Sequence, residues 1–251
     1  MSEHILTTKT EGVLKITLHH REKKNALTVE MYETLATLFE GADADPDIRA
    51  ILLEGDAEIF TAGNDLSAFL EATLWQGDEK PPVIKWIEAV ALSNTPLVAA
   101  VSGPAIGIGA TILLHFDFIY ADETAYFHMP FTDLATVPEA GASWILPKRF
   151  GRPIAAEFLL ACEKISPQRA YEIGYITKIV KDGDVREVAF NMAQALAKKP
   201  AEAMSMSKAL MRQDTDAFLA HIEKEARQFA SRLQSGEMQA VIMQRMQAKK
   251  G

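Results

Sequence analysis

Short apolar segments alternate with amphipathic segments through the first two-thirds of the chain, and this alternation most constrains the fold. Four segments have the apolar or β-branched composition of strands: 13–18, 48–53, 97–101 and 116–120. Three segments between them show helical spacing of apolar residues: 28–41, 82–94 and a stretch that ends near residue 115. Thr28 is expected to cap the first helix. Strands that alternate with helices in this way predict an α/β core.

The chain changes character near residue 184, because almost every later segment has the spacing of a helix. Pro200 interrupts this region, so we predict an α/β core over 1–198 and a C-terminal helical segment over 199–251, used for packing and oligomerisation. One apolar stripe of this segment consists of Phe218, Ile222, Phe229 and Leu233. The stripe fits packing on the core or on a neighbouring subunit, and the sequence does not choose between them.

The composition and charge of the chain argue against several classes of function. The chain has 251 residues, of which 48% are hydrophobic and 24% charged, as in a globular enzyme. Its net charge of −8 argues against nucleic-acid binding, which favours a basic excess. No apolar run is long enough to span a membrane, and the first ten residues lack the apolar core of a secretion signal. We therefore expect a cytoplasmic protein without membrane contact. The histidines lack metal-ligand spacing, so no metal site is expected.

Two glycine-bearing segments follow predicted strands, at residues 59–66 and 102–109. Glycine permits positive φ and a close approach of backbone to a ligand. The second segment opens a helix, where unpaired N–H groups favour negative charge. Neither segment has the spacing of a phosphate-binding or dinucleotide-binding loop. The residues alone leave open whether these glycines serve tight turns or an oxyanion site.

Ordered motifs resemble those of the crotonase (enoyl-CoA hydratase/isomerase) superfamily. Residues 60–66 (FTAGNDL) resemble its F-x-[AS]-G-x-D-[LI] loop, and 102–109 (SGPAIGIG), running on to Asp117, resemble its G-x-A-x-G block. Residues 25–27 (NAL) and 165–176 resemble two further motifs of that superfamily. The resemblance implies a ClpP/crotonase spiral of β-β-α turns with a helical C-terminal segment. It also implies an acyl-CoA substrate, no metal or redox cofactor, and a homotrimer or dimer of trimers.

The resemblance assigns roles to particular residues. The backbone N–H groups of Asn64 and Ile108 correspond to the two donors that polarise the thioester carbonyl. Such donors stabilise an enolate oxygen, and one donor is worth about 3–4 kcal/mol. The resemblance also implies which residues bind coenzyme A: Lys24, Ala26, Ala62, Gly63, Asp65 and Leu66.

The acid/base residues distinguish among the reactions of the superfamily. A typical hydratase of this superfamily carries two glutamates, whereas this chain has Thr111 and Phe131 at those positions. We expect both to line the acyl pocket together with His128. A carboxylate follows eight residues later, at Glu139, and this pattern resembles the peroxisomal-type delta-3,delta-2-enoyl-CoA isomerases. Shifting the double bond takes a proton from carbon 2 of the acyl chain and returns one to carbon 4, and a single base between these carbons can do both. An apolar pocket would raise the pKa of Glu139 toward the pH at which the enzyme works.

Several alternatives remain open at the sequence level. Glu139 is also compatible with an exposed position at the start of a helix running to Phe150, where the helix dipole favours a carboxylate. If Glu139 instead activates water, the chain would be a hydratase or an acyl-CoA hydrolase. A non-catalytic acyl-CoA-binding relative is a further possibility. His128 suits a packing or hydrogen-bonding role as well as one in the acyl pocket.

Overall fold

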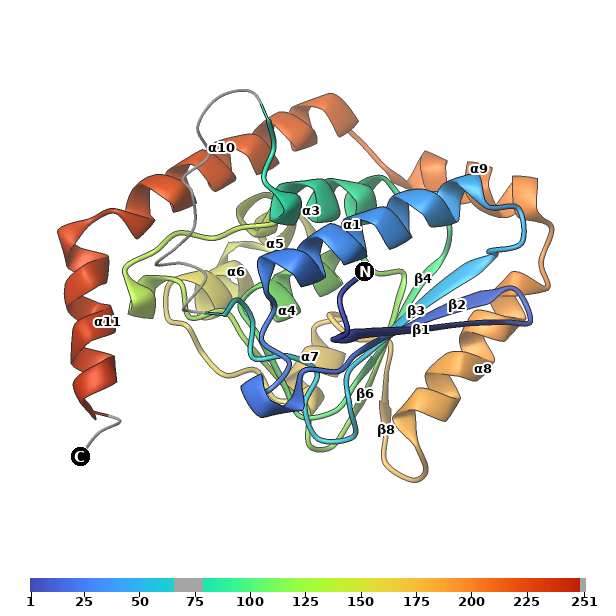
Figure 1. The fold of residues 1–251 in the computed structure, drawn as a ribbon, viewed down its shortest axis with the longest axis horizontal. Helices are drawn as coiled ribbons and strands as arrows, with labels where there is room; N and C mark the ends of the chain where they lie inside the picture. The colour runs from blue at the N-terminus through green and yellow to red at the C-terminus, as the bar shows by residue number, and fades with distance from the viewer. Residues whose placement is uncertain (66–78, 249–251) are drawn as a thin grey trace.

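A six-stranded sheet forms the centre of the computed structural model, which describes residues 1–65 and 79–248 (Figure 1). The strand order is β1 (Ile5–Thr10), β2 (Val13–Leu18), β3 (Ala50–Glu54), β4 (Leu97–Val101), β6 (Phe118–Asp122) and β8 (Lys178–Val180). The β1–β2 pair is antiparallel and every other neighbouring pair is parallel. All four predicted strands are thus confirmed: those at 13–18 and 97–101 have the predicted bounds, while β3 and β6 each start two residues later than the strands predicted at 48–53 and 116–120.

A second, two-stranded sheet carries the backbone that surrounds the glycine-bearing segments. It pairs β5 (Pro104–Ile106) with β7 (Tyr126–His128) in parallel. Isolated bridges join Thr61 to Ala105 and Phe127 to Ile165, so the first glycine-bearing segment lies beside this sheet. Each turn of the chain thus adds a strand to the main sheet, a short strand or bridge beside it, and a helix. This arrangement confirms the expected α/β spiral.

Helices cover both faces of the main sheet, as parallel sheets require. The helices α1 (Val29–Ala44) and α3 (Pro82–Leu92) pack together on one face, and α8 (Val185–Ala197) packs on the other (Figure 1). Because side chains of a strand alternate in direction, Ile51 and Leu53 join the core beneath α1, whereas Leu52 joins the core beneath α8. The predicted cap is confirmed, since the Thr28 side chain accepts from the Met31 N–H.

The segment that begins near Glu139 differs from the predicted helix. The helix α5 (Ala142–Phe150) starts three residues after Glu139, because Ala140 and Gly141 both have positive φ, at 57° and 75°. The expectation of a helix beginning at Glu139 is therefore wrong. After the second glycine-bearing segment, the chain forms the short helices α4 (Ile108–Thr111) and η2 (Ile112–His115), where one helix ending near residue 115 was predicted.

The C-terminal region comprises α9 (Ala201–Met211), α10 (Thr215–Leu233) and α11 (Gly236–Ala248). Three residues of the predicted α10 stripe, Phe218, Ile222 and Phe229, pack against the core of the same chain. The structure thereby decides the question that the sequence left open for this stripe. No helix within the described residues is both long and apolar enough to cross a membrane.

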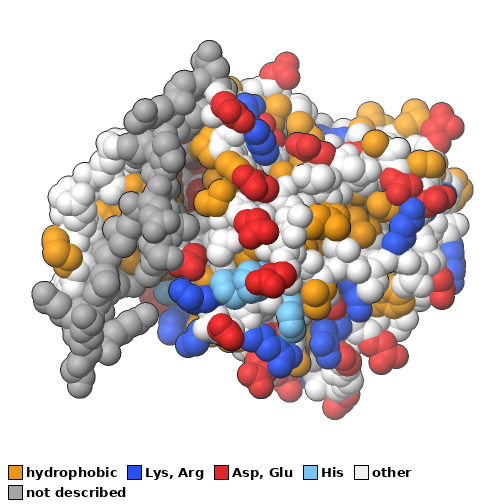
Figure 2. All heavy atoms as spheres, in the orientation of Figure 1, with side chains coloured by type: hydrophobic (Ala, Val, Ile, Leu, Met, Phe, Trp, Pro, Cys, Tyr) orange, Lys and Arg blue, Asp and Glu red, His pale blue; other side chains and the backbone are white. Residues whose placement is uncertain are grey.

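The remaining helices are short and connect the strands. They are η1 (Arg21–Lys23), η3 (Thr132–Leu134), α6 (Arg152–Leu159) and α7 (Pro167–Glu172). On the surface, Figure 2 shows histidine and basic side chains gathered over the region where Figure 1 places η1. The rings of His4 and His20 stack there, 3.9 Å apart, beside the exposed side chains of Arg21, Lys23 and Lys24.

Candidate active site

The two glycine-bearing segments lie side by side. The Thr61 N–H donates to the Pro104 carbonyl over 3.0 Å, and the Ile106 N–H donates to the Thr61 carbonyl over 3.1 Å. A Cβ at Gly63 would come within 2.7 Å of the Ile106 carbonyl oxygen, closer than any side chain allows. Glycine at this position therefore permits the close approach of the two segments.

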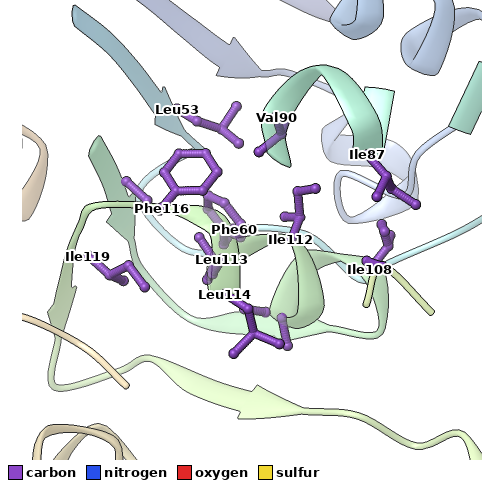
Figure 3. Packing of buried hydrophobic residues seen from close by; sticks show 14 of the residues in the cluster. Leu53, Phe60, Ile87, Val90, Ile108, Ile112, Leu113, Leu114, Phe116 and Ile119 are labelled. Carbon is purple, nitrogen blue, oxygen red and sulfur yellow. The ribbon is translucent and has the colours of Figure 1, made fainter. Parts of the chain in front are cut away.

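The predicted oxyanion donors belong to these adjacent segments. Within residues 1–65 and 79–248, no protein group accepts a hydrogen bond from the backbone N–H of Asn64 or Ile108. Gly107, with φ 57° and ψ −122°, begins the turn that leads into α4 and leaves the Ile108 N–H at the start of the helix. The Ile108 side chain is fully buried and belongs to the hydrophobic core drawn in Figure 3. Only backbone at Ile108 can therefore face a ligand.

Glu139 is the buried carboxylate of this site. Only 8% of its surface is exposed, and its carboxylate is hydrogen-bonded to the Asn64 side chain. The Tyr32 hydroxyl of α1 donates to Asn64 Oδ1, so the amide N–H of Asn64 is the group left to donate to Glu139. The alternative of an exposed glutamate at a helix start is wrong. Residues from α1, the first glycine-bearing segment and the loop before α5 thus meet at one point.

Burial raises the pKa of the Glu139 carboxyl group. Desolvation, with a smaller contribution from the nearby Glu225 carboxylate, raises the pKa of Glu139 from 4.5 to about 8, against the lowering effect of the Asn64 hydrogen bond. Burial and the charge of Glu139 also raise the pKa of Tyr32 well above its ordinary value. Tyr32 therefore remains a hydroxyl donor, and Glu139 can exchange a proton near neutral pH.

The predicted acyl-pocket residues take different positions. Phe131 is buried in the main core. The Thr111 hydroxyl is fully buried and donates to the Gly107 carbonyl over 3.3 Å, so it supports the turn before Ile108. The His128 carbonyl accepts from the Gly107 N–H over 2.8 Å, while its side chain is partly buried. Contact of these three residues with an acyl chain stays a prediction.

The predicted coenzyme A residues lie at the outer edge of the same segments. The Ala62 N–H donates to the Lys24 carbonyl over 3.0 Å, and Ala26 is buried just after η1. Two neighbouring cations are paired, Arg21 with Asp56 at 3.4 Å and Lys23 with Asp65 at 3.7 Å. Lys24 is exposed, and no described carboxylate lies within ion-pair distance of its Nζ. Leu66 lies outside the described residues.

Sequence reasoning missed two side chains of this site, Tyr32 and Glu225. Tyr32 falls on the apolar face of α1, where its spacing is that of a core residue. Glu225 lies on α10, distant in sequence from every motif, and is only 4% exposed. The one available signal was its spacing, because Glu225 lies three residues after Ile222 and four before Phe229 and so falls on the predicted apolar stripe.

A separate cavity of about 460 Å³ lies between α3, α5 and the α9–α10 connection. None of the predicted site residues lines it. His115 borders this cavity and also contacts the Ala140 carbonyl, next to Glu139 in the chain. The candidate active site is therefore defined by its contacts and not by this cavity.

Known proteins share this sequence and fold. The enoyl-CoA hydratase/isomerase family model matches residues 8–249. The chain is 32% identical to enoyl-CoA delta isomerase 2 of Rattus norvegicus, covering 89% of this chain and 58% of that protein. It is also 32% identical to 1,2-epoxyphenylacetyl-CoA isomerase of Escherichia coli, covering 83% of this chain and 81% of that protein. Other relatives bear hydratase names.

A solved structure of an enoyl-CoA hydratase/isomerase from Pseudoalteromonas atlantica superposes with a TM-score of 0.93 at 33% identity, covering 98% of each chain. The chain spans a little over half the length of the rat relative. Since the family model matches nearly every residue and the fold agrees, this chain belongs to the enoyl-CoA hydratase/isomerase family.

Proposed function

We propose that this chain is an enoyl-CoA isomerase that shifts the double bond of a 3-enoyl-CoA to the 2-position. The observation that carries the proposal is the meeting of one buried carboxylate, Glu139, with the side chain of Asn64. The backbone N–H of Asn64, like that of Ile108, has no acceptor among the described residues. A base and two candidate oxyanion donors thus belong to one cluster.

In the proposed reaction, the Glu139 carboxylate removes a proton from carbon 2 of the substrate. The electron pair of that bond moves toward the thioester oxygen, and the N–H groups of Asn64 and Ile108 stabilise the resulting dienolate. The protonated Glu139 then returns the proton to carbon 4, and the double bond settles between carbons 2 and 3. No atom is gained or lost. A pKa of about 8 suits a group that must both accept and release a proton near neutral pH.

Hydration is less well supported, because it uses a second carboxylate to activate water. Positions 111 and 131 hold threonine and phenylalanine. Glu225 is the other carboxylate close to Glu139, but both of its oxygens accept backbone N–H groups, those of Gly141 and Ser143. These bonds occupy Glu225 in a structural role.

Hydrolysis through a serine nucleophile is also poorly supported. Ser143 Oγ lies 2.9 Å from His221 Nε2, and Glu225 Oε1 lies 3.3 Å from the same nitrogen. A hydrolytic triad places the serine and the carboxylate on different nitrogens of the ring. The cluster therefore lacks the geometry needed to activate Ser143.

For coenzyme A, we propose that Lys24 contacts a phosphate, since it is the nearby cation that no described carboxylate neutralises. A trimeric assembly and a cytoplasmic location remain predictions.

A paired assay tests the reaction. Wild type and Glu139→Gln are each given a 3-enoyl-CoA and a 2-enoyl-CoA of equal chain length. We expect isomerisation of the first and little hydration of the second. Glu139→Gln should lower the isomerase kcat by about 10²- to 10⁴-fold, the usual contribution of a general acid–base.

Glu123→Gln, in an exposed turn, is the matched control and should retain full activity. Fast hydration by the wild type, or full isomerase activity of Glu139→Gln, would contradict the proposal.

A further inference from the structure

The Ala140–Gly141 peptide group, which lies one residue beyond Glu139, is held at both of its polar ends by side chains distant in sequence. Its carbonyl, that of Ala140, accepts a hydrogen bond from His115 Nε2 over 2.8 Å. Its N–H, that of Gly141, donates to Glu225 Oε2 over 2.6 Å. His115 belongs to η2 and Glu225 to α10. The same peptide group therefore connects the core and the C-terminal region.

This peptide group lies in strained backbone. Ala140 has φ 57°, a left-handed conformation that costs a residue with a Cβ roughly 1–2 kcal/mol. Such a conformation persists only where its surroundings hold it. The two hydrogen bonds from His115 and to Glu225 supply that restraint. Without them, the backbone next to Glu139 would relax toward a more favoured conformation and carry the carboxylate with it.

Further contacts fix the two restraining side chains. Glu225 Oε1 accepts from the Ser143 N–H over 2.9 Å and from the Ser143 hydroxyl. His221, one turn earlier on α10, lies 3.3 Å from the same oxygen. Burial lowers the pKa of His115 to about 4, so its ring is neutral at physiological pH. A carbonyl can only accept, so the neutral ring carries its proton on Nε2.

We propose that His115 and Glu225 are positioning residues for the reaction, which hold the Ala140–Gly141 peptide group and thereby aim Glu139 at the Asn64 side chain. This inference rests on the proposed role of Glu139 as the base. It assigns a part of the active site to α10, in the C-terminal segment that the sequence predicts for packing and assembly.

The proposal predicts effects on the pH profile as well as on rate. Asn64 and Glu225 act on the Glu139 carboxylate, the charge of Glu139 acts on Tyr32, and His221 lies beside Glu225. Lys208 and Arg149 act on His115. Because the Glu225 carboxylate raises the pKa of Glu139, its removal should lower that pKa.

The experiment measures the titration midpoint of Glu139 by NMR of protein labelled with δ-¹³C glutamate, with Glu139→Gln to assign the signal. The kcat and KM of the isomerase reaction are measured on the same samples. We expect Glu225→Gln to lower the midpoint by about one pH unit. It should also lower kcat by roughly 10- to 100-fold with little change in KM, since a misplaced catalytic group costs rate.

The His115 variants separate positioning from mere stability. His115→Phe keeps a ring but removes the N–H donor, and its kcat should fall as in Glu225→Gln. His115→Gln restores an N–H donor of similar reach, so most of kcat should return. Glu223→Gln, on the same helix as Glu225 and paired with Arg227 on the exposed side, is the matched control and should leave the midpoint and kcat unchanged.

Thermal unfolding of each variant establishes that it is folded. If Glu225→Gln does not fold, the His115 pair carries the test alone. Wild-type midpoints and wild-type kcat in Glu225→Gln and His115→Phe would overturn the proposal, as would equal losses in His115→Phe and His115→Gln. If the wild type does not isomerise 3-enoyl-CoA, the proposed function fails. The positioning role is then tested by the Glu139 midpoint in the His115 pair, because neither variant removes a charge that acts on Glu139. A midpoint that shifts in His115→Phe and returns in His115→Gln supports positioning, and an unchanged midpoint in both variants contradicts it.

Discussion

Asn64 combines two features of the candidate site in one residue. Its backbone N–H has no acceptor among the described residues, and its side chain joins Tyr32 to Glu139. The resemblance at residues 60–66 predicted only the backbone role, for which any side chain would suffice. The side-chain role requires an amide, because one end must accept from the tyrosine hydroxyl while the other donates to the carboxylate.

The buried Glu139 makes a prediction about stability at the residue scale. Its pKa of about 8 in the folded chain exceeds the ordinary 4.5, so between these values the unfolded chain releases a proton that the folded chain keeps. The free energy of unfolding should therefore fall as pH rises from 4.5 to 8 and then level off. The loss for this group is roughly 5 kcal/mol, at about 1.4 kcal/mol per pH unit over the 3.5 units between the two pKa values.

Glu139→Gln lacks this titration, so it should gain stability relative to wild type between pH 5 and pH 8.5. Urea unfolding of both proteins at the two pH values measures the difference, and all other ionisable groups are common to both. An identical pH dependence in the two proteins would show that Glu139 is not buried as described.

At the scale of elements, the first glycine-bearing segment depends on Asn25 for its position. This fully buried side chain donates to the Ile59 carbonyl over 3.0 Å and accepts from the His20 N–H over 2.7 Å. Its own carbonyl accepts from the Thr61 hydroxyl over 2.6 Å. The motif at 25–27 thus ties the end of β2 to the segment that holds Asn64, which explains why a polar residue is buried there.

The connection between Glu139 and α5 makes a prediction of its own. A Cβ at Gly141 would lie 2.5 Å from the Phe218 ring, and the residue has φ 75°. Gly141→Ala must therefore strain the backbone and displace the Phe218 ring. We expect a loss of about 2–4 kcal/mol in the free energy of unfolding, from the sum of backbone strain and overpacking.

Gly174→Ala is the matched control, because Gly174 also has φ 75° but no atom lies within 4 Å of its added Cβ. This variant should lose only the backbone cost of about 1–2 kcal/mol. Urea midpoints with unchanged slopes measure both losses. Equal losses in the two variants would mean that the contact between Phe218 and Gly141 is not tight.

At the scale of the whole molecule, the chain and the proposed coenzyme A thioester substrate are both negatively charged. The net charge of −8 repels the phosphates of coenzyme A, so local cations must attract them. The region of η1 gathers such cations, although aspartates pair with Arg21 and Lys23. Lys24 is the exposed lysine of this group that remains available.

Lys24→Ala should raise the KM for a coenzyme A thioester about two- to fivefold, the range of an exposed ionic contact, with the effect shrinking as salt is added. A pantetheine thioester lacks the nucleotide phosphates, so its KM should not change. Lys9→Ala, which removes the same charge from a lysine paired with Asp45 and Asp47, is the control. Equal effects of the two variants on the coenzyme A thioester would argue against a phosphate contact at Lys24.

The sequence by itself determined the α/β class, four strands of the main sheet and the position of the first helix cap. These depend on apolar periodicity and capping chemistry, which are local properties of the chain. It missed β1, whose residues after Ile5 are all exposed, and β8, which has three residues. Short or solvent-facing strands carry little hydrophobic pattern, and their pairing partners are distant in sequence.

The motifs and the resemblance also singled out Glu139, Asn64 and Ile108 as candidate site residues. Only the tertiary structure decided that Glu139 is buried and that Tyr32 contacts Asn64. It likewise decided that α10 packs on its own chain and brings Glu225 to the Ala140–Gly141 peptide group. The physical reason is that desolvation, like-charge proximity and a hydrogen bond across 84 residues arise from packing between distant segments, which local sequence patterns do not encode.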